Sequence, residues 1–437
     1  VLLEKLSYIG HNTIDRSDGT EGGDYMKKII LASALTAGLL VMPLQAVCAS
    51  EVNETNVVSN LDISELKYED IQKVIMEKSL KVRINTDTIN STENGYLSIQ
   101  DSKDSLSNSI SSLNRTIRNL KESETEPDAD IASIETQIST LNSRVDSLEE
   151  SLTSLENQEA DVAKSLEKAK LSIEMANKVI VFQTESLFFT EDALLQQRQT
   201  LENNLTYLNK SYDVLKLRLT LGMVSELDLK DMEQKNKDLK NQTELISQRV
   251  DSIRGQVNIL IAQDFNHPLN LITQVLVDEG KIKAMNYNND FVTAMDKNYS
   301  LKLQQMVIEA KQLTIDHAEE TDGQDSYVYK GALADLDAET LKFEEVQRET
   351  EQAFDTVSDT VHNNMEAYQL EKDRFDIFKI KLNNARLSNQ LGLISDLDML
   401  GVTVEYNNQE LKLQNANEEL FKAFTAYQWF LDGVNVS

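Results

Sequence analysis

The sequence predicts an all-α chain made of long antiparallel coiled-coil hairpins in two repeats, with little or no β structure. Only three prolines and 14 glycines occur in 437 residues, where average usage gives roughly 20 and 30, so few residues interrupt a helix. Apolar residues recur in alternating steps of three and four, as in helices that pair along a narrow seam. A nine-residue motif also occurs twice, which indicates an internal duplication.

The N-terminal region carries a predicted export signal. A Met-Lys-Lys start at 26–28 precedes an apolar stretch, and Val47-Cys48-Ala49 has the small residues of a signal-peptidase site. We expect a signal peptide at 26–49. A lipid-anchored Cys48 is the alternative that the sequence leaves open. We interpret residues 1–25 as an over-extended start, because Glu21–Tyr25 can be encoded by a purine-rich run that resembles a bacterial ribosome-binding site.

The longest heptad segment covers about 98–180, and we expect a coiled-coil hairpin there. Pro127 separates two helices that fold back on each other, and Asp128 or Asp130 can cap the second, which we expect to run without a break to Leu221. Only Glu159 interrupts the seam between 131 and 180. The seam before and after Pro127 consists of Leu106, Ile110, Leu113, Ile117 and Leu120, then Ile131, Ile134, Ile138, Leu141, Val145, Leu148, Leu152, Leu155, Val162, Leu166, Ala169, Ile173, Ala176 and Ile180.

The repeated motif is Leu221–Leu229, which recurs as Leu391–Met399 with five of nine positions identical. In each copy a glycine can take the left-handed conformation that ends a helix. A serine three residues later, with an aspartate three residues beyond it, provides the capping-box pattern that begins the next helix. We therefore expect two tight helix–turn–helix tips.

A weaker repeat lies upstream of each tip, where Ser79-Leu80-Lys81-Val82 matches Ser300-Leu301-Lys302-Leu303. The first copy is about 51 residues longer, and the excess falls in the hairpin around Pro127. Turn-forming residues predict the opposite end of the second hairpin at 321–331 and a helix break at Asn94-Gly95. The predicted domains are a first repeat at 60–263, a linker at 264–285 and a second repeat at 286–433.

Composition bears on function by exclusion. The net charge is −30, from 43 basic and 73 acidic residues, so we expect no nucleic-acid partner, because phosphate binding requires clustered Lys and Arg. We expect no transmembrane helix in the mature chain, since no apolar stretch of about 18 residues follows the leader. His317 lies near Glu319 and Glu320, but the spacing matches no ligand scheme and a solvated acidic loop is the better interpretation. We expect no enzyme, no metal and no cofactor.

The two tips resemble those of the TolC-like outer-membrane efflux protein family. There, each of two repeats contributes long helices joined by a glycine-containing turn of the form Val-Gly-Leu-x-x-x-x-Asp. The end of the helix after the first tip, Leu260–Leu269 with its His267-Pro268 step, and the C-terminal Ala426–Gly433 are also similar. The resemblance covers most of 60–433, but only the tips are specific.

The resemblance implies a homotrimer that forms a helical tube and docks a periplasmic-type adaptor, or membrane fusion protein, of an export pump. It places Asp398 at the tube constriction, although Gly401 stands where the family has a second acidic residue. Asn389 and Leu393 replace a Tyr and an Arg that latch some members closed. The implied adaptor-docking residues are Leu221, Gly222, Met223, Ser225, Asp228, Leu391, Gly392, Leu393 and Ser395.

One departure from the family concerns its membrane-spanning strands. Members insert two strands per repeat between the long helices. Here the equivalent places hold the Pro127 coiled coil and the short loop around Gly323, where Tyr327–Tyr329 is the only β-like stretch. We therefore expect a TolC-like helical tube without those strands.

The sequence leaves two functions open. The first is an exported component of an efflux or type I-secretion-like assembly in the cell envelope, associated with the outer membrane in a diderm source or with the cell wall in a monoderm one. The alternative is a structural or adhesive coiled-coil spacer with no role in transport.

Overall fold

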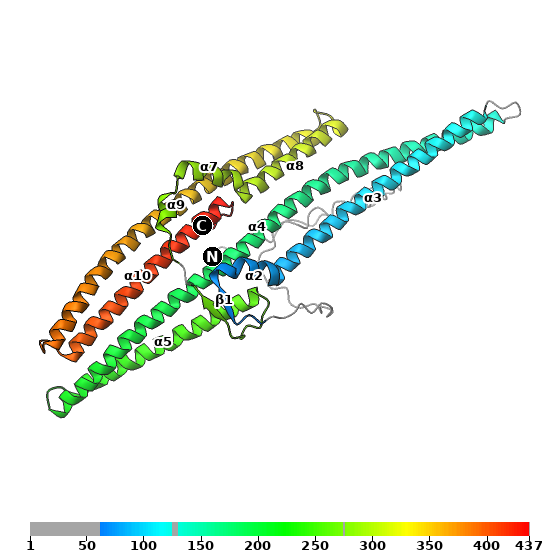
Figure 1. Ribbon diagram of the computed structural model, residues 1–437. Helices are drawn as coiled ribbons and strands as arrows, with labels where there is room; N and C mark the ends of the chain where they lie inside the picture. The colour runs from blue at the N-terminus through cyan, green and yellow to red at the C-terminus, as the bar shows by residue number, and fades with distance from the viewer. Residues whose placement is uncertain (1–61, 125–129, 274–275, 437) are drawn as a thin grey trace, which may run out of the picture. The chain divides into compact units, whose positions relative to one another are not determined.

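The computed structural model describes residues 62–124, 130–273 and 276–436. The predicted leader, the signal peptide with Cys48, and Pro127 lie outside these residues. Long helices dominate the described part, as predicted (Figure 1). They are α3 (Leu80–Ser123), α4 (Ile131–Thr220), α5 (Glu226–Leu260), α8 (Tyr299–Asp322), α9 (Tyr327–Gln390) and α10 (Asp396–Leu431). Shorter elements are β1 (Glu65–Lys67), η1 (Tyr68–Asp70), α2 (Ile71–Lys78), β2 (Asn270–Ile272), α6 (Glu279–Lys283) and α7 (Tyr287–Lys297).

The long helices pack as neighbours in a fixed order. Near the α4–α5 and α9–α10 turns, which are the two predicted tips, the helices lie side by side in the order α5, α4, α10, α9. Near the α3–α4 and α8–α9 turns the order is α3, α4, α8, α9. Helix α4 is therefore central, because it packs against α3, α5, α8 and α10. Within the described residues, α9 does not pack closely against α3 or α5. This leaves α9 as one edge of the row, and α3 with α5 as the other.

Each repeat begins with a short helix, a one-residue break and a long helix. The break is Ser79 in the first repeat, with φ −61° and ψ 126°, and Asn298 in the second, with φ −56° and ψ 122°. The alignment of Ser79 with Ser300 is therefore wrong by two residues. With the corrected register, Ile75 and Ala294, each fully buried, occupy the same place in their repeats.

The helices that follow the tips have nearly equal lengths, 35 residues in α5 and 36 in α10. The helices on the other side differ widely: α3 and α4 have 44 and 90 residues, whereas α8 and α9 have 24 and 64. The additional residues of the first repeat therefore extend the α3–α4 hairpin.

The predicted coiled coil is present between α3 and α4. Buried Ile110, Ile117, Ile138 and Val145 form its core with flanking leucines, and Asp130 accepts the capping hydrogen bond from the Ser133 N–H. The residues in this core are among the seam residues that the heptad pattern predicted. The coiled-coil part of the fold prediction is confirmed.

The heptad interruption is a polar layer of this coiled coil. Glu159 on α4 accepts hydrogen bonds from Lys103 Nζ at 2.6 Å and from Gln100 Nε2 at 3.0 Å. Tyr96 OH donates to the same carboxylate at 3.4 Å. The predicted break at Asn94-Gly95 is wrong, because α3 continues through it. Glycine inside a helix costs only about 1 kcal/mol relative to alanine, and packing of the next turn against α4 compensates.

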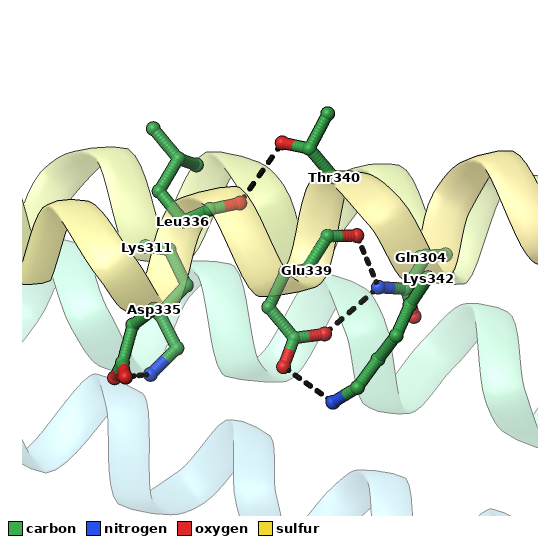
Figure 2. A network of polar contacts seen from close by, with 7 residues as sticks. All are labelled: Gln304, Lys311, Asp335, Leu336, Glu339, Thr340 and Lys342. Carbon is green, nitrogen blue, oxygen red and sulfur yellow. Dashed lines mark hydrogen bonds and ion pairs between the residues drawn. The ribbon is translucent and has the colours of Figure 1, made fainter.

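The second hairpin turns at Gly323, which has φ 79°, within the predicted range. Tyr327–Tyr329 is not extended: Ser326 accepts a hydrogen bond from the Tyr329 N–H at 3.0 Å and begins α9 there. Polar contacts join α8 to α9 beyond this turn (Figure 2). They are Lys311 with Asp335 at 2.8 Å and Gln304 with Glu339 at 2.9 Å, and Lys342 also contacts Glu339 at 2.7 Å.

Strand structure is small in the described chain, as predicted. β1 and β2 form one parallel pair of three residues each. Leu66 and Leu271 from these strands, with Phe188 of α4, belong to the first-repeat core, while the second-repeat core gathers Phe354 of α9 and Phe430 of α10. Across the described residues, no helix combines the length and apolarity that a bilayer-spanning helix needs.

Candidate functional site

The first tip is residues 221–229, the turn between α4 and α5. Gly222 has φ 66°. Its N–H donates to Leu219 O at 3.0 Å, and the Met223 N–H donates to Arg218 O at 3.0 Å. These two bonds define a Schellman turn, in which a left-handed residue lets the last free carbonyls of a helix be satisfied. The predicted left-handed glycine is confirmed.

The second tip, residues 391–399, repeats this geometry between α9 and α10. Gly392 has φ 72°, and its N–H donates to Asn389 O at 2.9 Å. The Leu393 N–H donates to Ser388 O at 2.8 Å. The duplicated sequence therefore gives a duplicated turn.

Each tip ends in a capping box. The Asp228 N–H donates to Ser225 Oγ at 3.2 Å, and the Ser225 N–H donates to Asp228 Oδ2 at 2.9 Å. Ser395 and Asp398 make the same pair of bonds, at 3.1 Å each. Hydrogen bonds from the serine lower the pKa of each aspartate. The larger contribution comes from the Ser225 N–H at the first tip and from the Ser395 hydroxyl at the second. Two orphan donors at each helix start are thereby satisfied.

Large apolar side chains project from both tips into solvent. Leu221 and Met223 are 65% and 68% exposed, and Leu391 and Leu393 are 64% and 72% exposed. Leu217 and Leu387, which precede the two glycines by five residues, are exposed as well. The backbone hydrogen bonds fix the turns from which these side chains project, and exposed apolar side chains gathered in one place are typical of binding sites.

The tips differ in the side-chain contacts of Asn389. Asn389 Nδ2 donates to Ile394 O at 3.3 Å and to Asp396 Oδ1 at 3.1 Å, so this side chain crosses the second turn. The corresponding residue of the first tip is Leu219, which cannot make these bonds. Asn389, which stands where some family members have a latch tyrosine, therefore stabilises the turn of the second tip.

Contacts between α4 and α10 hold the two tips at the same end of the row of helices. Asn408 of α10 bonds to Asn203 at 3.3 Å and to Asn204 at 3.0 Å. A Cβ added at Gly401 would lie 3.4 Å from the Tyr207 ring, so the position where the family has an acidic residue here packs against an aromatic ring. The sequence offered no signal for these contacts, since each joins residues about 200 positions apart.

The structure places Asp398 at the start of α10, exposed and bonded to Ser395. Asp228 occupies the same position in the first tip. A role for Asp398 at a constriction stays a prediction. Sequence reasoning missed Leu217 and Leu387, although their equal distance from the two glycines was a usable signal.

In the part of the chain that the structure describes, no group of three or more His, Cys, Asp or Glu side chains converges on one point. His317 lies in α8, and Glu319 nearby accepts a hydrogen bond from Gln324 at 2.6 Å across the turn. Glu319 therefore takes part in the turn between α8 and α9.

Two helical-hairpin repeats with matched turns and a long central helix define a class of fold, the helical framework of TolC-like outer-membrane efflux channels. Solved structures confirm it. The outer membrane protein VceC from Vibrio cholerae superimposes with a TM-score of 0.56 at 10% identity, covering 84% of this chain and 96% of that chain. CusC gives 0.55 at 9% identity, covering 84% and 92%. The MtrE outer membrane channel of Neisseria gonorrhoeae, in its open state, gives 0.51 at 10% identity, covering 84% and 89%.

These likenesses establish the fold of the chain. No protein-family model matches the sequence, and no curated protein matches it. The fold class and the TolC-like resemblance inferred from the tips are confirmed at the level of structure.

Proposed function

We propose that the chain is an exported component of an efflux or type I-secretion-like assembly in the cell envelope, and that its two tips dock the helical hairpins of an adaptor protein. The observation that carries this proposal is the pair of matched tips, each rigid in its backbone and each presenting exposed leucine or methionine side chains. A pure spacer gains nothing from apolar side chains at its ends, because they favour unwanted association.

We further propose that copies of the chain associate as a homotrimer. The two free edges of the helix row both carry exposed apolar side chains: Leu370, Ile377 and Ile380 on α9, and Leu245 and Ile259 on α5. Because the edges are different surfaces, the α9 edge of one copy meets the α5 edge of the next. Such head-to-tail contacts close into a ring when the rotation between copies allows it.

The tips are tested by substitution. Gly222→Val and Gly392→Val place a branched side chain at a left-handed position, which costs roughly 1–2 kcal/mol and displaces the exposed leucines. We expect each to weaken binding of a purified adaptor encoded beside this protein's gene, and the double variant to abolish it. Gly331→Val is the matched control, because Gly331 lies inside α9 with open space around it and an ordinary helical conformation.

Normal adaptor binding by the double tip variant would remove the tips from the mechanism and favour the coiled-coil spacer. A loss of binding by the Gly331→Val control as well would show that the assay reports general destabilisation. Genomic context gives an independent check, because an adjacent adaptor and pump favour transport.

Assembly is tested by the molar mass of residues 50–437, measured by light scattering after size exclusion. We expect a trimer mass, increasingly populated as salt rises, because screening reduces repulsion between chains of net charge −29 (the −30 of the full sequence less the −1 of residues 1–49). A monomer or dimer at every salt concentration would contradict the ring and favour the structural spacer.

A further inference from the structure

The seam between the two tip hairpins, where α4 packs against α10, is mixed at its far end and polar toward the tips. At the far end the rings of Phe189 and Phe421 lie 5.9 Å apart, and Trp429 Nε1 donates to Glu185 at 2.7 Å. Toward the tips, hydrogen bonds of Gln196 and of the asparagines cross the seam. Polar seams are the places where packed helices separate at least cost, because water replaces the lost hydrogen bonds.

Two carboxyl groups meet in the middle of this seam. Gln196 Nε2 on α4 donates to Asp192 Oδ2 at 3.0 Å and to Glu418 Oε1 of α10 at 2.5 Å. One amide group thus bridges two acids, one on each helix. Because like charges this close in a partly buried site repel strongly, the arrangement is stable when one acid keeps its proton.

Among the described residues, no cation contributes to the electrostatic setting of Glu418. Along α10 the neighbouring acid is Glu419, and α9 presents Glu371 to the cavity of about 430 Å³ that Gln196 also lines. Glu371 already accepts hydrogen bonds from Gln409 and from Arg374. Lys412 lines the same cavity but is exposed, so its charge is screened by solvent.

The proton affinity of Glu418 follows from this setting. Burial first, and then the adjacent Asp192, raise the pKa of Glu418 to about 9. A raised pKa in the folded state means that the stabilisation is fully present below the ordinary pKa of 4.5. It declines as pH rises and is lost once pH passes the folded value. At neutral pH the seam is therefore held with Glu418 protonated.

We propose that the proton on Glu418 is a switch for the α4–α10 seam: with the proton in place the two tip hairpins stay together, and when Glu418 ionises the paired carboxylates separate them. The switch sets the spacing of the first tip from the second. It belongs to a single chain and is independent of the export role proposed above.

The test measures the distance between the two hairpins in the full chain. Spin labels are attached to Lys210→Cys on α4 and Glu405→Cys on α10, both exposed positions, after Cys48→Ser removes the native thiol. Labelled chain is diluted with unlabelled chain, so that only distances within one chain are read. We expect the mean distance to increase by several ångström between about pH 7 and about pH 10, with its midpoint near the Glu418 pKa of about 9.

Two variants and a second label pair separate the switch from general unfolding. Glu418→Gln keeps the acceptor oxygen without a titratable proton and should hold the distance constant. Glu419→Gln, the same change one residue along at a side chain that is 46% exposed, should still open, with its midpoint at a slightly lower pH because Glu419 adds to the raised pKa of Glu418. Labels at Arg386 and Glu405, within one hairpin, should show no change. A wild-type distance that stays constant, or a Glu418→Gln variant that opens like the wild type, would overturn the proposal.

Discussion

Among the helices that the structure describes, four end in the same left-handed turn, but in two different settings. At the tips, Gly222 and Gly392 have nothing within 4 Å of the place where a side chain would begin. At the opposite ends of the same hairpins, which we call the roots, the left-handed residue that follows α5 is Ala262, with φ 60°, and the one that follows α10 is Gly433, with φ 88°. The hydrogen bonds have the Schellman pattern in all four.

The tips and the Gly433 root differ in how closely other atoms surround the left-handed residue. A Cβ at Gly433 would lie 2.2 Å from Lys297 O, and the Tyr299 N–H donates to Gly433 O at 3.0 Å. This root therefore anchors the start of α8 to the end of α10. At the tips glycine is required only by backbone conformation, whereas at the Gly433 root it is required by space as well. The same local motif serves a projecting surface at one end and the tertiary structure at the other.

The largest effect is expected at the packed root. Gly433→Ala combines a left-handed alanine, roughly 1–2 kcal/mol, with overpacking against the backbone at Lys297, roughly 1–3 kcal/mol. We expect the free energy of unfolding to fall by about 3 kcal/mol, measured by urea denaturation. Gly392→Ala is the matched control, and with open space around it only the left-handed term remains, an expected loss of roughly 1–2 kcal/mol.

Equal losses at the two glycines would contradict this comparison, because they would show that space at the root contributes nothing. If oligomers form, denaturation at several protein concentrations separates the change within a chain from a change in association.

A smaller effect of opposite sign is expected at the other root. Ala262 already occupies a left-handed position, so Ala262→Gly removes backbone strain. The greater entropy of unfolded glycine offsets part of the gain. We expect a net stabilisation of about 0.5 kcal/mol, seen as a higher thermal midpoint. Loss of stability in this variant would mean that the alanine methyl group makes a packing contact worth more than the strain.

The sequence predicted best those features that depend on residues close together in the chain. The heptads identified the α3–α4 core, and the motif around Gly222 identified both the left-handed turn and the capping box, because each is built from residues within one or two helical turns. The root at Ala262 shows the limit of this reasoning. Alanine gives no local sign of a left-handed residue. The turn is held by the Gln263 N–H, which donates to Asn258 O at 2.8 Å, and by Gln263 Nε2, which donates to Ile63 O at 3.3 Å.

Features that depend on distant residues were missed. Gly95 was expected to break α3, but contacts of the following turn with Glu159, more than 50 positions away, keep the helix continuous. The sequence identity between Ser79 and Ser300 suggested the wrong alignment, because Asn298 is the residue at the structural position of Ser79. The carboxyl pair at Asp192 and Glu418 joins helices from different repeats, and nothing local in either helix indicates it.

The smallest effect distinguishes the tips from the roots by pH. Hydrogen bonds from serine lower the pKa of Asp228 and Asp398, so these acids stabilise the tips above their ordinary pKa of 3.8, and the stabilisation is lost as pH falls through the lower folded value. The double variant Asp228→Asn and Asp398→Asn should therefore have a lower thermal midpoint than the wild type at neutral pH, and the difference should vanish in strong acid. Asp231→Asn, one turn after Asp228 and exposed, gives the background for loss of a surface charge. A difference that persists unchanged at low pH would mean that the aspartates act through the shape of the turn and that their charge contributes nothing.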